Sequence, residues 1–221
     1  DEDGRMYVAD YQARKAYRFA QDGTLEMTFE KPEAASFGRN SSYIPLKVAP
    51  GDGGGLYLVN EGSVAGIVQM SGDGEFLGYF AANTVSLSIG DLLRSIFLTE
   101  EQQRFSMART PPAFANIFRG DDRLIYTINR GEHVAIKKHA ISGANLLDDG
   151  HAGMLLDNPV DLAVAADGRM LAVYSDGTVG EYTADGYFVC LFAGPGNRTD
   201  RIGLFDAPSG IGVDSSNNIY V

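Results

Sequence analysis

Residues 167–174 read DGRMLAVY, which is an Asp-Gly turn signal followed by a short apolar strand. A turn signal followed by a short apolar strand recurs at 3–10, 54–60, 122–129 and 216–221. The copies lie roughly 46 to 50 residues apart, except for one interval of about 69, and a period of this size built from short strands is typical of a β-propeller. We therefore expect an all-β chain in which each repeat forms one blade.

Each repeat can be divided into four strands. An inner strand follows a proline or a polar turn and is expected at 44–49, 114–118, 159–164 and 208–213. The apolar strand quoted above comes second, and the third strand alternates apolar and polar residues, as in 178–182. The fourth follows a tight turn at 22–23, 73–74, 142–143 and 185–186, which predicts a fourth strand at 143–147 in the third repeat. Asp-Gly suits a two-residue hairpin because both turn positions favour positive φ.

These repeats predict a single propeller segment over residues 1–221. The expected blades are 1–43, 44–80, 114–158, 159–207 and a partial blade at 208–221. Residues 81–113 break the period, so we expect an insertion there. Within it, Thr99-Glu100-Glu101-Gln102 is a capping box that predicts a helix to about Arg109, before Pro111 and Pro112. The insertion would act as a brace over apolar surface or as a lid.

The pattern resembles the NHL-repeat family, above all at 208–221, 3–10 and 167–186. The third repeat departs most from the family pattern, at Asn129 and His139. The resemblance implies a propeller of about six blades, with about four present here. It also implies a bacterial protein that is extracellular or in the cell envelope. No signal peptide is visible in this segment, and a membrane anchor would lie outside it.

The expected strands also suggest that the chain is part of a larger ring. The first repeat lacks an inner strand, which residues 209–213 could supply if the chain closed into a ring of four blades. Residues 218–221 and 6–9 would then both be the second strand of the same blade, and only one of them could take that place. A compact four-bladed propeller with an extra strand is the alternative.

The composition of the chain argues against nucleic acid as a partner and against a membrane-spanning helix. The net charge is −11, from 18 basic and 29 acidic residues, and such a surface repels the phosphates of nucleic acid. No apolar run of 18 residues occurs, so no transmembrane helix is predicted. The single cysteine, Cys190, lies in the apolar run 187–192, and we expect it to be a buried thiol.

Candidate site residues come from the inner strands. Asn116 and Asp161 lie on two of them, and Asn158 directly precedes one, so all three are expected near a channel mouth. Polar residues in such places are commonly solvated by channel water. Gluconolactonases and paraoxonases, which are similar six-bladed rings, hold Ca²⁺ at the channel mouth, since this hard cation selects oxygen ligands. The histidines His133, His139 and His151 show no metal-ligand spacing, and the sequence offers no catalytic constellation.

Two hypotheses of function follow. The first is a non-catalytic scaffold that presents its loops and the insertion to a protein, peptide or glycan, without a cofactor. The alternative is a calcium-dependent hydrolase or lyase of the gluconolactonase or streptogramin-lyase type, with Asn116 and Asp161 near the metal.

Overall fold

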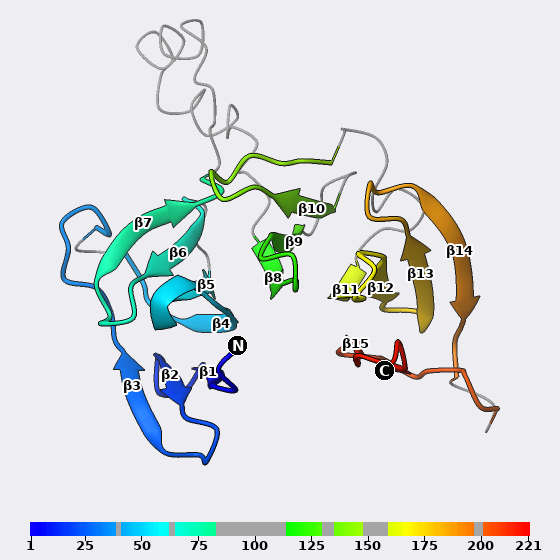
Figure 1. Cartoon of the computed structure of the whole chain (residues 1–221), viewed down its shortest axis with the longest axis horizontal. Coiled ribbons are helices and arrows are strands. Elements are labelled where there is room, and N and C mark those ends of the chain that lie inside the picture. Colours follow the sequence, from blue (N-terminus) through cyan, green and yellow to red (C-terminus); the bar gives the residue numbers. More distant parts are fainter. Residues whose placement is uncertain (39–40, 62–64, 83–113, 130–134, 148–158, 197–200) are drawn as a thin grey trace, which may run out of the picture.

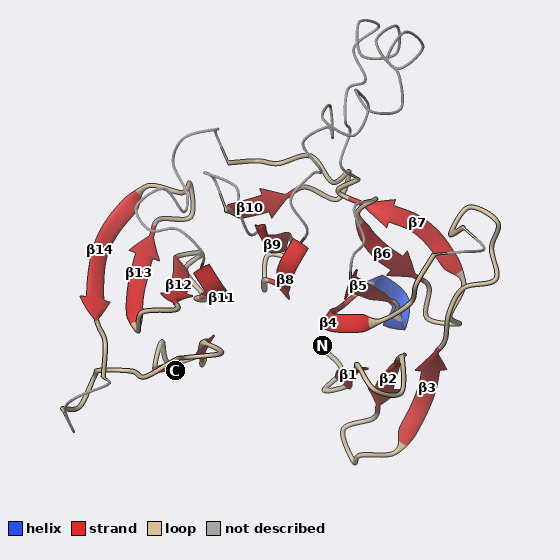
Figure 2. Cartoon of the chain, turned by 180° about the vertical axis from the view of Figure 1, so that it is seen from behind, coloured by secondary structure: helices blue, strands red, loops and turns tan. Residues whose placement is uncertain are grey.

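A computed structural model describes residues 1–38, 41–61, 65–82, 114–129, 135–147, 159–196 and 201–221. This part of the chain is almost entirely strand and loop, with one short 3₁₀ turn at Asp52–Gly54 (Figure 2). Its helices include none that is long and apolar enough to cross a membrane. The expectation of an all-β chain is confirmed.

The described strands form five antiparallel sheets. The first sheet contains β1 (Met6–Asp10), β2 (Lys15–Phe19) and β3 (Leu25–Phe29). The second contains β4 (Pro45–Pro50), β5 (Leu56–Asn60), β6 (Ile67–Met70) and β7 (Phe76–Phe80). The third contains β8 (Phe114–Arg119), β9 (Ile125–Asn129) and β10 (Ile136–His139).

The remaining strands belong to the last two sheets. The fourth contains β11 (Pro159–Val164), β12 (Met170–Tyr174), β13 (Thr178–Tyr182) and β14 (Phe188–Ala193). The fifth contains β15 (Gly212–Val213) and β16 (Ile219–Tyr220).

The sheets stand around a common axis like the blades of a propeller (Figure 1). The strands β1, β4, β8, β11 and β15 lie nearest this axis, and each contacts the next in that order. The described sheets form an arc, with β1 at one end and the small fifth sheet at the other. The prediction of propeller blades built from short antiparallel strands is therefore confirmed, with four described strands in the second and fourth sheets.

A bulge recurs at one place in the inner strands. The strand register shifts between Pro45 and Lys47 in β4, and at the corresponding points in β8 and β11. A β-bulge adds one residue and re-aims the side chains that follow it. Lys47, Asn116 and Asp161 come directly after these bulges, so they occupy the same position in successive repeats.

The apolar core lies between the sheets. Because alternate residues of a strand point to opposite faces, a sheet with a neighbour on each side buries both sets. The strands β5, β9 and β12 are accordingly buried at every residue. Leu56 and Leu58 of β5 pack toward the first sheet with Ala16 and Phe29, whereas Tyr57 of β5 packs toward the third sheet. Each second strand thus contributes to two interfaces.

The predicted fourth strand of the third repeat is not a strand in the structure. The described residues there form only an isolated bridge between His139 and Asn145. The side-chain oxygen of Asn145 accepts the Lys138 amide hydrogen, and its nitrogen donates to the Leu147 carbonyl. A short polar side chain that bonds to nearby backbone competes with the ladder of a strand, which explains the difference.

The prediction of a buried Cys190 was wrong. Cys190 lies on β14 and its side chain is exposed, as are those of Phe188, Val189 and Leu191 on the same strand. β14 is the outermost strand of the fourth sheet, and the next described sheet has only two strands near the axis. An apolar run therefore did not imply burial here. The predicted helical insertion falls mainly on residues 83–113, outside the described residues.

The interfaces between sheets predict where substitutions weaken the fold. Leu58 is completely buried between the first and second sheets. We expect Leu58→Ala to lower the free energy of unfolding by about 2 to 5 kcal/mol, because it removes apolar contacts and leaves a cavity. Urea denaturation followed by circular dichroism measures this loss. The control is Leu77→Ala, since the Leu77 side chain is 59% exposed and should cost less than about 0.5 kcal/mol. Equal losses would contradict the assignment of the core.

Candidate functional site

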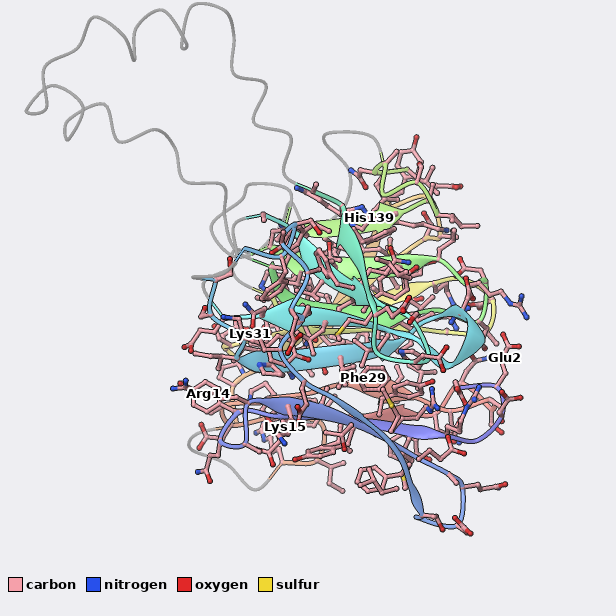
Figure 3. All side chains as sticks on the ribbon, turned by 90° about the vertical axis from the view of Figure 1, so that its left-hand side faces the viewer. Glu2, Arg14, Lys15, Phe29, Lys31 and His139 are labelled. Atoms are coloured by element: carbon pink, nitrogen blue, oxygen red, sulfur yellow. The ribbon has the colours of Figure 1, made fainter. Side chains whose placement is uncertain are left out.

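The inner strands have two distinct ends, which Figure 3 shows in side view. Arg14, in the β1–β2 connection, lies at one end, and Glu2 lies at the other. We call the first the loop end, because the β1–β2 connection lies there and because β3 ends and β4 begins there. We call the second the turn end, because the turns between β4 and β5 and between β8 and β9 lie there. Each end carries one candidate site.

At the loop end the structure brings Asn116 and Asp161 together, although they belong to different sheets. Asn116 is 4% exposed, and its Nδ2 donates to Oδ1 of Asp161 at 2.5 Å. The grouping predicted from the inner strands therefore exists for this pair. The third predicted member, Asn158, lies outside the described residues.

The oxygens of this pair are already used as hydrogen-bond acceptors. Oδ1 of Asp161 accepts the Leu162 amide hydrogen at 2.8 Å in addition to the bond from Asn116, and Oδ2 accepts that of Ile211 at 3.0 Å. Oδ1 of Asn116 accepts from the Ile117 amide at 2.8 Å. Calcium needs six to eight oxygen ligands, whereas Asn116 turns its nitrogen and not its oxygen toward Asp161, so the pair as arranged does not fit the ion.

At the turn end a cleft of about 890 Å³ opens between the first three sheets. Its backbone lining comes from the ends of β4 and β8 and from the turns that follow them. Its charged side chains are those of Asp1, Glu2, Asp3, Arg5, Asp52, Arg119, Asp121 and Arg123. Ligand sites for small molecules are commonly concave and of this size.

Arg119 joins two walls of the cleft. Its side chain is 13% exposed, its Nη2 lies 2.6 Å from Oδ1 of Asp52, and its Nη1 donates to the Pro50 carbonyl at 3.3 Å. The guanidinium of Arg123 reaches across to both carboxylate oxygens of Glu2, at 2.9 and 3.1 Å. The cleft can therefore offer both guanidinium donors and carboxylate acceptors to a polar molecule.

The sequence analysis did not find this cleft. Its charged residues come from three different repeats and from turns whose composition is ordinary for exposed turns. The only sequence signal would have been an arginine at the end of the 114–118 strand, where other inner strands end in apolar residues. A single arginine at the end of a strand does not indicate a cleft unless the residues that surround it in space are known.

A chain of polar side chains also runs through the third sheet. Thr127 and Asn129 lie on β9 and His139 on β10, and all three are buried. Thr127 Oγ1 lies 2.9 Å from Nε2 of His139, whose Nδ1 lies 3.0 Å from the Gly143 carbonyl. Because a carbonyl only accepts, Nδ1 carries a proton. The Thr127 hydroxyl lies within reach of both Nε2 of His139 and Oδ1 of Asn129, the latter at 3.4 Å. Burial favours the neutral form of the imidazole.

The neighbouring sheets place other residues at the same positions. His139 pairs with the first residue of β9, as Met70 does with that of β5 and Tyr182 with that of β12. Asn60 corresponds to Asn129, and its amide bonds to Ser42 and Ile44. The side-chain nitrogen of Asn129, Nδ2, has no partner among the described residues. The third sheet thus carries polar groups at positions that are apolar or fully paired in the second.

Comparisons with known proteins support the fold. No family model matches the chain, and a search of curated proteins finds no match. Solved structures do match. A streptogramin B lyase structure shares 12% identity at a TM-score of 0.59, covering 99% of this chain and 72% of that one. A gluconolactonase from Xanthomonas campestris shares 12% identity at a TM-score of 0.61, covering 97% and 64%.

A protein of unknown function from Bacteroides caccae shares 11% identity at a TM-score of 0.56, covering 97% of this chain and 63% of that one. At such low identities these likenesses show the propeller fold alone. They do not show membership of the NHL-repeat family that the repeat pattern resembles. The match to each solved chain leaves more than a quarter of that chain uncovered.

The buried imidazole predicts a pH dependence of stability. Burial lowers the pKa of His139 below its ordinary value of 6.5, and the nearby Lys137 charge acts in the same direction, against the opposing Gly143 bond. The unfolded ring therefore binds a proton at a higher pH than the folded ring. The contribution of His139 to the free energy of unfolding is therefore greatest above pH 6.5, and it falls as the pH drops toward 5 by at most about 1.4 kcal/mol per pH unit.

The measurement compares the wild type with His139→Met. This variant has methionine at the position that Met70 occupies in the second sheet. Urea denaturation between pH 7.5 and 5 should give a smaller decline for the variant than for the wild type. Parallel curves for the two proteins would show that His139 does not titrate with folding.

Proposed function

We propose that this chain is part of a propeller enzyme, a hydrolase or lyase, that takes a small polar molecule into the cleft at the turn end. The observation that carries the proposal is this cleft, which lies beside the axis in a fold shared with a streptogramin B lyase and a gluconolactonase. Concave sites with a few converging polar groups are the usual places for small-molecule chemistry in proteins.

The charges of the cleft favour a neutral or cationic molecule. Carboxylates outnumber guanidinium groups among the lining side chains, and Asp52 and Asp121 stand in the turns that border the opening. Such a field repels anions and raises the local concentration of cations. A neutral lactone could enter, and the carboxylate that its hydrolysis releases would be repelled. The carboxylates are also the groups available to transfer a proton.

A non-catalytic scaffold is the second candidate. The exposed apolar side chains of β14 favour it, since large exposed apolar patches often mark interaction surfaces. Its partner would be a protein, peptide or glycan, and an exported protein of the cell envelope would suit this role. The calcium dependence of the enzyme hypothesis has no support from the Asn116–Asp161 pair as it is arranged.

The proposal is tested by assaying the purified chain against streptogramin B and a panel of neutral lactones. Arg119→Met removes the bonds to Pro50 and Asp52 that shape the cleft. We expect it to lower kcat/KM by roughly tenfold or more, which corresponds to about 1.4 kcal/mol of transition-state stabilisation. Circular dichroism verifies that the variant folds.

The matched control is Arg169→Met. Arg169 is likewise an arginine in ion pairs, here with the carboxylates of Asp167 and Glu181, but it lies in the β11–β12 turn of the fourth sheet and does not line the cleft. It should leave kcat/KM nearly unchanged. Absence of turnover with every substrate, together with specific binding on a peptide or glycan array, would reject the enzyme proposal in favour of the scaffold.

A further inference from the structure

We propose that hydrogen bonds to the Asp161 carboxylate hold three successive inner strands together at the loop end, and we call this network the latch. The Asn116–Asp161 pair then has a structural role and does not bind a calcium ion. The proposal rests on the direction of each hydrogen bond around the pair and is independent of the function proposed for the cleft.

The first connection runs from the third sheet to the fourth. Asn116 of β8 donates its side-chain amide to Oδ1 of Asp161 at 2.5 Å, and to the Val160 carbonyl at 3.4 Å. Asn116 is held in this orientation because its own oxygen accepts the Ile117 amide hydrogen. The amide therefore presents its donor side, and not its oxygen, to the neighbouring strand.

The second connection runs from the fourth sheet to the fifth. Oδ2 of Asp161 accepts the backbone amide of Ile211 at 3.0 Å, directly before β15. Gly210 makes this approach possible, since a Cβ at that position would lie 3.3 Å from Oδ2 of Asp161. The fifth sheet has only two short strands, and it otherwise contacts the fourth through apolar residues such as Ile211 and Val213. The carboxylate thus supplies a directional bond to a weakly anchored sheet.

The hydrogen-bond donors around Asp161 distinguish a structural network from a metal site. An ionised carboxylate only accepts hydrogen bonds, and Asp161 receives N–H groups from Asn116, Leu162 and Ile211. To place its oxygen on an ion beside Asp161, the Asn116 amide would have to turn over, which would break its bond to Asp161 and leave the buried Ile117 amide without its acceptor. Unsatisfied buried donors are costly, so the observed network opposes metal binding.

The position in the repeat supports the same view. Lys47 and Gly210 occupy the corresponding place in the second and fifth repeats. Lys47 is exposed, and Gly210 has no side chain. Residues that supply calcium ligands at each repeat of the ring would carry side-chain oxygens, and Lys47 and Gly210 do not. In this set the amide of Asn116 and the carboxylate of Asp161 are the two neighbours that meet as donor and acceptor between adjacent sheets.

The latch is tested with Asp161→Asn in the full chain. An amide replaces one acceptor oxygen with a donor. Because Oδ1 of Asp161 receives two N–H groups and Oδ2 receives one, we expect the amide nitrogen to take the place of Oδ2, so that the bond from Ile211 is lost. We expect the melting temperature to fall by the same amount in CaCl₂ and in EDTA. We also expect the Ile211 amide hydrogen, observed by NMR, to exchange at least about tenfold faster than in the wild type, because local opening becomes easier.

Two further variants complete the design. Asp167→Asn is the matched control, since Asp167 lies in the β11–β12 turn of the same sheet and the bonds of its side chain to the described residues go to Arg169 within that turn. It should leave Ile211 exchange unchanged. Gly210→Ala keeps every hydrogen-bonding group yet crowds Asp161, and it should accelerate Ile211 exchange without a dependence on calcium. This variant decides the question if Asp161→Asn does not fold.

The contrary results are specific. A wild-type protein that melts at a higher temperature in CaCl₂ than in EDTA, with the difference abolished by Asp161→Asn, would show a calcium site and overturn the proposal. Unchanged Ile211 exchange in both Asp161→Asn and Gly210→Ala would overturn it as well.

Discussion

Each sheet in the middle of this chain has two apolar faces, and each face needs a neighbouring sheet to cover it. The strands β5, β9 and β12 show this constraint most clearly, because they are buried at every residue. Burial of apolar area is the main stabilising contribution to folding, so a single sheet of this composition would not be stable alone. The exposed apolar residues of β14 show the reverse case, since the described neighbour there is too small to cover them.

Apolar packing alone does not determine how the sheets are oriented around the axis, because the hydrophobic effect is not directional. Polar groups supply that information at both ends of the inner strands. At the turn end Arg119 connects β8 to the turn after β4. At the loop end Asp161 connects β8, β11 and the segment before β15. The two ends are therefore held by different chemistry, and at the turn end charged groups surround an open cleft.

This difference bears on function. The polar pair that the sequence brings to attention is occupied by hydrogen bonds within the protein, whereas the cleft that the sequence does not reveal has exposed charged groups, such as the carboxylates of Asp3 and Asp52. The likeness to a lyase and a gluconolactonase shows a common fold, and a fold supports many unrelated activities. The geometry of the cleft is consequently a better guide to function than the inner-strand residue types.

The sequence by itself determined the propeller, because the Asp-Gly turns and alternating strands are local patterns whose period is visible without any long-range contact. It also brought Asn116 and Asp161 to the same position of successive repeats. Only the tertiary structure decided what these residues do, since the direction of a hydrogen bond depends on how an amide is oriented against its neighbour. It likewise decided that Cys190 is exposed, that Asn145 interrupts a fourth strand, and that residues from three repeats line one cleft. Each of these outcomes depends on which segments meet in space, and a local pattern carries no such information.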